Sequence, residues 1–419
     1  MSSQVLDVYL LGRLVGKFCS DNATLSFVYD PDYVCQPNAL KLSASLPLEN
    51  LTFSHQITSS FFSGLLPDEG VRQRLAAYLG LSEKNTFALL KEVGGECAGA
   101  VSVYPEGVSP NTDNTPTYRV LENDEADSIL MSLARKPFLA GDDDIRISGA
   151  GAQDKLMISF VGDKIAIPTG STPSTHIIKP AILEFEDTVY NEFFCMKLAK
   201  AVGLVVPDVD VYWVKRKPYY LIERYDRSKQ DDGKVIRLHQ EDFCQAMHIA
   251  PEIKYESEGG PTLNQCFSLL DDRIQNGFMG GKNKLLLLQG VIFNFLIGNG
   301  DAHGKNFSML YKEEEEELAP LYDLLCTVIY SNPFKVKMAM KLSGKYKFRE
   351  VSKSHWIKLG KDIGFRVDFV ENQLLNMSNK MLCEYPILIS KLNENPKTVS
   401  PIYERIGDVI YEYSRKISM

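Results

Sequence analysis

The sequence predicts an α+β protein in which a strand-rich lobe is followed by a helical lobe, with an N-terminal α+β subdomain ahead of both. Three patterns support this prediction. Short apolar runs of strand type dominate residues 142–238, and one clear helical stretch, TVYNEFFCMKLAKAVG, interrupts them. From His239 onward, apolar residues recur mostly at helical spacing. Residues 1–104 mix alternating strands with a helical stretch, FFSGLLPDEGVRQRLAAYLG.

A polar connector separates the N-terminal subdomain from the rest of the chain. The segment GVSPNTDNTPTYRVLENDEAD is rich in Pro, Asn, Asp and Thr, which are typical of turns and linkers. The chain has 419 residues, enough for two or three domains with buried cores. We therefore expect an N-terminal subdomain at residues 1–110, a strand-rich lobe at 120–240 and a helical lobe at 241–419.

The charge balance argues against a broad nucleic-acid-binding face. The net charge is −8 and the pI is near 5.5, so the long-range field repels polyanions. Any contact with DNA is expected to be local or supplied by a basic partner. The acidic run at residues 313–317 is expected to be a solvated loop, because adjacent carboxylates repel one another.

Cysteine usage and hydropathy indicate a cytoplasmic protein. The eight cysteines are scattered without a CxxC pair, so neither a disulfide framework nor a zinc site is expected. The N-terminal stretch MSSQVLDVYLLGRLVG lacks a basic leader, so no signal peptide is expected. The most apolar window, LLLLQGVIFNFLIG, is shorter than the roughly 20 residues of a membrane span, so no membrane association is expected.

The stretch IGNGDAHGKNFSML carries the strongest chemical signal. It follows an apolar and therefore buried helix, which Gly298 and Gly300 can end. An isolated Asp and Asn five residues apart are usually turn residues. In protein kinases, however, an Asp that orients the acceptor hydroxyl is followed five residues later by an Asn that binds Mg²⁺, and a further Asp binds metal downstream. Asp301 and Asn306 have this spacing, and Asp323 follows 22 residues after Asp301.

Two upstream residues fit the same chemistry. Lys179 ends the strand-type run in THIIKP, where a lysine can reach the phosphates of a nucleotide, and Glu192 in the next helix can pair with it. Taken alone, each is more commonly a surface residue. One carboxylate and one amide are enough protein ligands for Mg²⁺ that also binds phosphate oxygens.

Two further segments fit nucleotide binding. In DIRISGAGAQDKLMISF, read as strand, loop and strand, the small residues 149–152 let main-chain N–H groups approach a phosphate. A tight hairpin is the alternative, and a Walker A motif is absent. The strand in YYLIERYDR runs into Glu223, Arg224 and Tyr225, the position from which a kinase hinge offers main-chain groups to adenine.

Together, ISGAGAQDK, THIIKP, NEFFCMKLAK, IERYDR, KYESEGGP, GNGDAHGKN and PLYDLL resemble the HipA family of bacterial Ser/Thr kinases. The N-terminal elements SASLPL, FFSGLLPD and GAV resemble the N-terminal subdomain of the longer family members. The resemblance covers almost the whole chain and implies a protein-kinase-like two-lobed fold that uses ATP and Mg²⁺.

The resemblance also implies roles for individual residues. Asp301 would be the catalytic base, and Asn306 and Asp323 the Mg²⁺ ligands. Ser148 matches the autophosphorylation site that silences the kinase, and Glu192 would form a structural ion pair with Lys179. The nucleotide would be bound by Ala150, Gly151, Ala152, Gln153, Asp154, Lys155, Lys179, Glu223, Arg224, Tyr225, His303, Gly304, Lys305, Asn306, Tyr322 and Asp323.

Family members are the toxins of toxin–antitoxin pairs and modify aminoacyl-tRNA synthetases, glutamyl-tRNA synthetase among them. The implied partner is a small basic helix-turn-helix antitoxin of the HipB type, through which DNA would be bound indirectly. The acidic balance of this chain fits such a partner.

Two alternatives stay open. One is a catalytically silent partner of a DNA-binding repressor; the intact set of Lys179, Asp301, Asn306 and Asp323 favours the kinase instead. The other is a metal-dependent hydrolase using Asp301 and His303, which is weaker because no second His or carboxylate stands at ligand spacing nearby.

Overall fold

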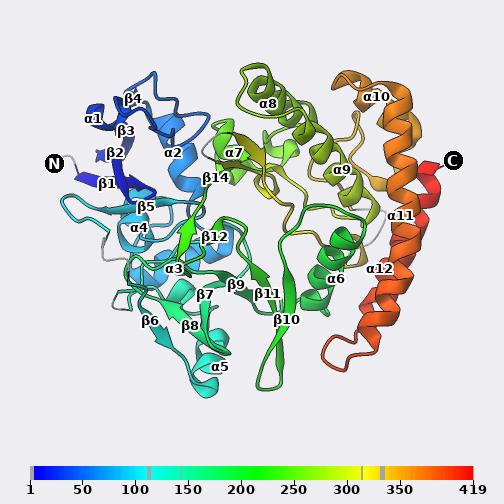
Figure 1. Ribbon diagram of the computed structural model, residues 1–419, viewed down its shortest axis with the longest axis horizontal. Coiled ribbons are helices and arrows are strands. Elements are labelled where there is room, and N and C mark those ends of the chain that lie inside the picture. The colour runs from blue at the N-terminus through cyan, green and yellow to red at the C-terminus, as the bar shows by residue number, and fades with distance from the viewer. Residues whose placement is uncertain (1–3, 111–114, 143, 313–314, 331–335, 419) are drawn as a thin grey trace. The chain divides into compact units, whose positions relative to one another are not determined.

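Figure 1 shows a computed structural model of the chain, which describes residues 4–110, 115–142, 144–312, 315–330 and 336–418. The chain divides into two compact units. The first unit contains residues 1–180, 223–252 and 310–312, and the second unit contains residues 181–222, 253–309 and 313–419.

The first unit begins with a five-stranded sheet in the order β4-β3-β2-β1-β5, whose neighbouring strands are antiparallel. In β3, Leu25, Phe27 and Tyr29 are buried and alternate with less buried residues, as expected for a strand with one face on a core. The strands are β1 (Gln4–Leu10), β2 (Arg13–Asp21), β3 (Thr24–Tyr29), β4 (Thr52–Phe53) and β5 (Val101–Pro105).

Aromatic side chains join this sheet to its helices. Phe18 on β2 stacks on Phe62 of α2 with ring centroids 4.2 Å apart, and it also contacts Phe87 of α4. The side chain of Asn85 accepts a hydrogen bond from the backbone N–H of Ala88 and so caps α4. The helices are α1 (Pro31–Val34), α2 (His55–Gly64), α3 (Glu69–Leu79) and α4 (Thr86–Val93).

The rest of the first unit contains four antiparallel strands in the order β9-β7-β8-β6. The predicted strand before the small-residue loop is only an isolated bridge between Ile147 and Glu96, whereas the strand after the loop is β7. The elements here are β6 (Tyr118–Val120), α5 (Asn123–Ser132), β7 (Leu156–Val161), β8 (Lys164–Pro168), β9 (His176–Lys179), β12 (Arg227–Lys229), β13 (Val235–Arg237), β14 (His239–Asp242) and α7 (Phe243–Ala246).

The second unit is mainly helical, as the apolar periodicity predicts. The long helices α11 and α12 run side by side (Figure 1), and the ring of Phe295 in α9 lies within 5.5 Å of the rings of Trp356 and Tyr413. The elements are α6 (Thr188–Ala201), β10 (Val209–Val214), β11 (Lys217–Glu223), α8 (Leu263–Gln275), α9 (Lys282–Leu296), β15 (Ser308–Tyr311), β16 (Glu316–Leu318), α10 (Lys353–Asp362), α11 (Val367–Asn393) and α12 (Ile402–Ser418). Two of these strands are divided between the units. Glu223 at the end of β11 and residues 310–311 at the end of β15 belong to the first unit.

The prediction for the acidic run is wrong at Glu316. Residues 313 and 314 lie outside the described residues, but Glu316 lies in β16 and is buried. Both of its carboxylate oxygens accept hydrogen bonds from Arg273 at 2.7 Å. A bidentate cation from a distant helix, which the local run does not reveal, allows this carboxylate to be buried.

In the part of the chain that the structure describes, none of the helices is long and apolar enough to cross a membrane.

Candidate active site

The loop that carries Asp301 starts from a firmly held helix end. α9 ends at Leu296 with Ile297 as its C-cap, and Gly298 has a φ of +70°, a conformation that favours glycine. A side chain at Gly298 would clash with Val328 and Val409. The predicted helix end at the glycines is therefore confirmed.

Asn299 ties together the two chain segments that carry the candidate carboxylates. Its side-chain oxygen accepts a hydrogen bond from the backbone N–H of Asp301 at 3.0 Å. Its side-chain N–H₂ donates to Oδ1 of Asn294 at 2.7 Å and to the backbone oxygen of Asp323 at 3.3 Å. Asn299 is only 3% exposed. One buried amide thus fixes the main chain at Asp301 and Asp323.

Asp323 itself has an uncommon backbone conformation. Its φ of +51° lies in the left-handed region, which Asp and Asn tolerate better than most residues but which still costs free energy. The hydrogen bond from Asn299 to its carbonyl helps to hold it there. Such conformations cluster at functional sites, where the surrounding structure enforces them.

The residues from Asp301 to Asn306 form a short, closed turn. The side-chain N–H₂ of Asn306 donates to the backbone oxygen of Asp301 at 2.8 Å. Nε2 of His303 lies 3.9 Å from Oδ1 of Asp301, and the side chain of Asp301 is 44% exposed while that of His303 is buried. The hydrogen bond from its nitrogen therefore fixes the orientation of the Asn306 amide. The Asp301 carboxylate remains accessible to a reactant.

Lys305 and Tyr322 connect the end of this turn to the segment before Asp323. The hydroxyl of Tyr322 donates to the backbone oxygen of Lys305 at 2.7 Å and also shares a hydrogen bond with the hydroxyl of Ser308. The backbone N–H of Ala319 donates to the backbone oxygen of Ser308, a second hydrogen bond between the same two segments. The second unit thus brings together Asp301, His303, Gly304, Lys305, Asn306, Tyr322 and Asp323.

α6 braces the chain just after Asp323. Its Asn191 is fully buried, donates to the backbone oxygen of Cys326 at 2.9 Å and accepts from the backbone N–H of Cys326 at 2.8 Å. Glu192, the next residue, is 5% exposed and lies in the helix as predicted. A buried carboxylate at this position requires polar or charged partners.

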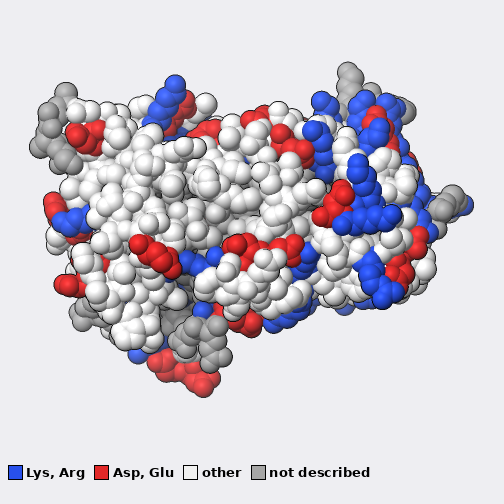
Figure 2. Space-filling view, turned by 90° about the horizontal axis from the view of Figure 1, so that it is seen from above, with Lys and Arg blue, Asp and Glu red and all other residues white. Residues whose placement is uncertain are grey.

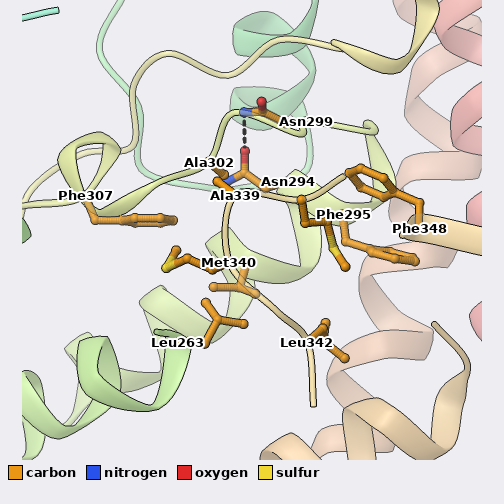
Figure 3. A pocket seen from close by; sticks show the side chains of 12 residues that line it. Leu263, Asn294, Phe295, Asn299, Ala302, Phe307, Ala339, Met340, Leu342 and Phe348 are labelled. Atoms are coloured by element: carbon orange, nitrogen blue, oxygen red, sulfur yellow. Dashed lines mark hydrogen bonds between the residues drawn. The ribbon is translucent and has the colours of Figure 1, made fainter. Parts of the chain in front are cut away.

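A small, mostly apolar cavity of about 30 Å³ lies beneath the candidate catalytic loop (Figure 3). Asn299 and Ala302 of the loop line it together with Phe307, Met340 and Phe348. The hydrogen bond between Asn299 and Asn294 crosses one side of it (Figure 3). The loop therefore lies over mainly apolar side chains.

The first unit holds the small-residue loop through contacts with its own N-terminal part. The hydroxyl of Ser148 donates to the backbone oxygen of Leu65 at 2.8 Å, and Ser148 is completely buried. The backbone N–H of Asp68 donates to the oxygen of Gly151 at 3.1 Å. Arg74 pairs with the carboxylate of Asp154 at 2.6 Å. In this conformation Ser148 cannot accept a phosphate without leaving its place.

Within the loop, glycine and a buried lysine define the conformation. Gly151 has a φ of +109°, and a side chain there would collide with the ammonium of Lys155. That ammonium donates to the backbone oxygen of Ala150. Gln153 donates to the backbone oxygen of Pro180 at 2.9 Å, which places the loop next to the end of β9 and hence to Lys179. Ala152 continues the loop between these residues.

The predicted hinge residues have different surroundings. The Arg224 guanidinium is buried and donates to Asp226 at 2.9 and 2.7 Å and to the Ser174 hydroxyl at 3.0 Å. Its backbone N–H donates to the oxygen of Thr175 at 2.9 Å, and its backbone oxygen accepts from the N–H of Arg227 at 3.3 Å. That oxygen, which can accept a second hydrogen bond, is therefore the group of Arg224 left for a nucleotide. Glu223 is exposed at the end of β11, and the Tyr225 hydroxyl donates to Gln240.

Opposite charges stabilise this hinge network. Burial alone would raise the pKa of Asp226, but the guanidinium groups of Arg224 and Arg227 hold it well below its usual range. Glu96 behaves likewise: burial opposes ionisation, yet the nearby arginines, Arg227 foremost, lower its pKa. Arg227 donates to Glu96 at 2.9 Å. Glu96 lies in the N-terminal part of the chain, far in sequence from the residues that it supports.

Comparisons with known proteins agree with this geometry. Residues 6–104 match the HipA N-terminal domain, and residues 147–384 match the HipA-like C-terminal domain. The serine/threonine-protein kinase toxin HipA of Shewanella oneidensis is 32% identical over 356 residues, which cover 81% of this chain and 79% of that protein. Y4mE of Sinorhizobium fredii, whose name describes it as a candidate kinase, is 41% identical over 381 residues and 90% of both chains.

A solved structure shows the same fold. A chain in the complex of HipA, HipB and operator DNA from Shewanella oneidensis MR-1 aligns with a TM-score of 0.80 and 26% identity, covering 99% of this chain and 96% of that one. The predicted α+β fold is confirmed, and so is the resemblance carried by the motifs. The chain belongs to the HipA family of serine/threonine-protein kinases.

Proposed function

We propose that this chain transfers the γ-phosphoryl group of ATP to a serine or threonine hydroxyl, with Asp301 as the catalytic base. The observation that carries the proposal is the arrangement in the second unit. Asn299 fixes the main chain at Asp301 and Asp323, and Asn306 closes the turn on Asp301. The exposed carboxylate and its two neighbouring oxygen donors are thus fixed on one rigid framework.

The donor set of Asn306 and Asp323 fits Mg²⁺. The Asn306 nitrogen is committed to the Asp301 carbonyl, so the amide oxygen is the atom left to face a cation. One amide and one carboxylate oxygen suit a hard cation that also binds phosphate oxygens and water. Mg²⁺ would neutralise charge on the transferring phosphoryl group.

The protein contributes mainly by positioning the reactants. Asp301 would align the acceptor hydroxyl and take up its proton as the hydroxyl oxygen bonds to the γ-phosphorus and the bond to the ADP oxygen breaks. We assign the phosphates to Lys179 and to the loop from Ala150 to Lys155. We assign adenine to main-chain groups of Glu223, Arg224 and Tyr225. Further contacts with the nucleotide are assigned to His303, Gly304, Lys305 and Tyr322. Glu192 would pair with Lys179.

The biological role that we propose is that of the toxin in a toxin–antitoxin pair. The substrate class is a component of translation in the cytoplasm, with an aminoacyl-tRNA synthetase, glutamyl-tRNA synthetase first, as the leading candidate. The partner is a HipB-like helix-turn-helix antitoxin that supplies the DNA contact, as in the related complex that contains HipB and operator DNA. On the face drawn in Figure 2, a wide area carries no charge, and where charged side chains gather both signs lie next to one another, which fits indirect DNA binding.

Ser148 would be the site of self-inactivation. Its hydroxyl is buried against the Leu65 carbonyl, and a phosphate there would be expelled together with the loop.

The test uses purified chain, Mg-ATP and purified glutamyl-tRNA synthetase, followed by peptide mass spectrometry. We expect phosphate on the synthetase and on Ser148 with the wild type, and on neither with Asp301→Asn. Phosphate on Ser148 alone would reject the synthetase as substrate but keep the kinase. ATP binding without any transfer would favour the silent-partner alternative.

A further inference from the structure

The motif KYESEGGP, residues 254–261, has no role in the assignments above, yet it lies next to Asp301. The Tyr255 hydroxyl donates a hydrogen bond to Oδ1 of Asp301 at 2.5 Å. The Tyr255 ring packs edge-on against the His303 ring, with centroids 5.1 Å apart and planes at 84°. This one side chain therefore contacts both the carboxylate and the turn that presents it.

Tyr255 is held by a turn that only glycine permits. The backbone N–H groups of Glu258 and Gly260 both donate to the oxygen of Tyr255 at 2.9 Å. Gly259 has a φ of +104°, and a side chain at Gly260 would collide with the backbone of Ile253 and Lys254. The two glycines of the motif thus close the main chain behind Tyr255.

The next residue anchors the motif on its other side. The backbone N–H of Glu256 donates to the oxygen of Ala339 at 3.1 Å, and the Glu256 carboxylate accepts from the backbone N–H of Lys341 at 2.5 Å. The Glu256 side chain is 9% exposed. After the motif, Thr262 and Gln265 form a capping box that starts α8. The motif is therefore tied to the segment at residues 339–341 and continues directly into α8.

We propose that Tyr255 is a positioning residue that fixes the orientation of the Asp301 carboxylate, and that the KYESEGGP motif exists to hold it there. The inference rests on the proposed role of Asp301 as catalytic base. The hydrogen bond from the Tyr255 hydroxyl to Oδ1 restricts the rotation of the carboxylate that would align the acceptor hydroxyl. Without that hydrogen bond, the half-exposed carboxylate samples other rotamers and is less often aligned for transfer.

The test compares full-length wild type, Tyr255→Phe and Tyr403→Phe. Tyr255→Phe keeps the ring against His303 and removes only the hydroxyl. Tyr403→Phe is the matched control, because it removes a tyrosine hydroxyl of the same unit that donates to the backbone oxygen of Thr398 at 2.5 Å. Initial rates of phosphate incorporation are measured by intact mass at varied Mg-ATP concentrations.

For Tyr255→Phe we expect about a tenfold lower maximal rate, with the half-saturating ATP concentration within about twofold of the wild type. We expect Tyr403→Phe to match the wild type. A maximal rate for Tyr255→Phe within about twofold of the wild type would overturn the inference, and so would an equal loss in ATP affinity, which indicates general damage.

If the wild type itself transfers no phosphate, the proposed function fails, and amide hydrogen exchange of the peptide 297–306 then decides the inference. Faster exchange in Tyr255→Phe than in the wild type and Tyr403→Phe would support the anchoring of this turn by the hydroxyl. Equal exchange in all three proteins would refute it.

Discussion

Substituting Asp226 by Asn should expose how strongly the buried charge network holds the hinge. The Asp226 carboxylate accepts four hydrogen bonds, two from Arg224, one from the backbone N–H of Gly99 at 2.7 Å and one from Gln240 at 3.1 Å. The side-chain N–H₂ of Asn would face some of these donors instead of accepting from them. The buried guanidinium groups of Arg224 and Arg227 would also lose the negative charge that balances them. Removing one partner of such a network costs about 3–5 kcal/mol.

The cost has a defined pH dependence. Because the folded-state pKa of Asp226 lies below the unfolded value of 3.8, the carboxylate contributes its full stability above that value. The contribution is lost as the pH falls through the range below about 4. The difference in the free energy of unfolding between wild type and Asp226→Asn should therefore be constant from pH 6 to pH 8 and become smaller in stronger acid.

Hydrogen exchange is the suitable assay, because both tryptophans, Trp213 and Trp356, lie in the second unit and their fluorescence does not report directly on this network. We expect the free energies of hydrogen exchange to fall by about 3–5 kcal/mol for peptides covering residues 94–101 and 172–178. Glu106→Gln, which breaks an exposed pair with Lys17, is the control and should change nothing measurable. A loss for Asp226→Asn no larger than that of the control would refute the reasoning.

Two other predictions concern the catalytic loop and a buried acid. Asn299→Ala should lower the rate of phosphoryl transfer at least tenfold, because Asp301 and Asp323 lose their common anchor; an unchanged steady-state rate would contradict the assigned role. Burial raises the pKa of Glu241 to about 7, so the folded protein retains a proton that the unfolded chain, with a pKa of 4.5, releases. The stabilisation from Glu241 is thus present below pH 4.5 and lost as the pH rises toward 7. Urea titrations should show the wild type losing about 3 kcal/mol relative to Glu241→Gln across this range, and a difference independent of pH would exclude the shift.

Local patterns predicted the features that depend on neighbouring residues in the chain. The helix end at Gly298, the strand that carries Lys179 and the helix that carries Glu192 all lie where periodicity and turn residues placed them. The spacing of Asp301, Asn306 and Asp323 could be read directly, because it reflects one loop and the segment that follows it. The roles of these residues, and the division at 110, 120 and 240, stay predictions.

Contacts between distant segments could not be read in the same way. Asn299 reaches Asp323 through a side chain, and Asn191 reaches Cys326 across 135 residues. Periodicity says only that such polar residues lie on a buried face, not which backbone groups they satisfy. The wrong expectation for Glu316 has the same origin, since its partner Arg273 lies 43 residues away. The one local signal for this anchor is an Asn between two glycines just before the candidate catalytic Asp.

Asp301 is proposed to serve phosphoryl transfer on a nucleotide site that does not depend on its carboxylate. The most direct measurement is intact mass after incubation with Mg-ATP, combined with calorimetric ATP binding, for wild type and Asp301→Asn. We expect an added phosphate in the wild type alone, with ATP affinity within about threefold in the two proteins. Equal phosphate in both proteins, or none in the wild type despite bound ATP, would contradict it.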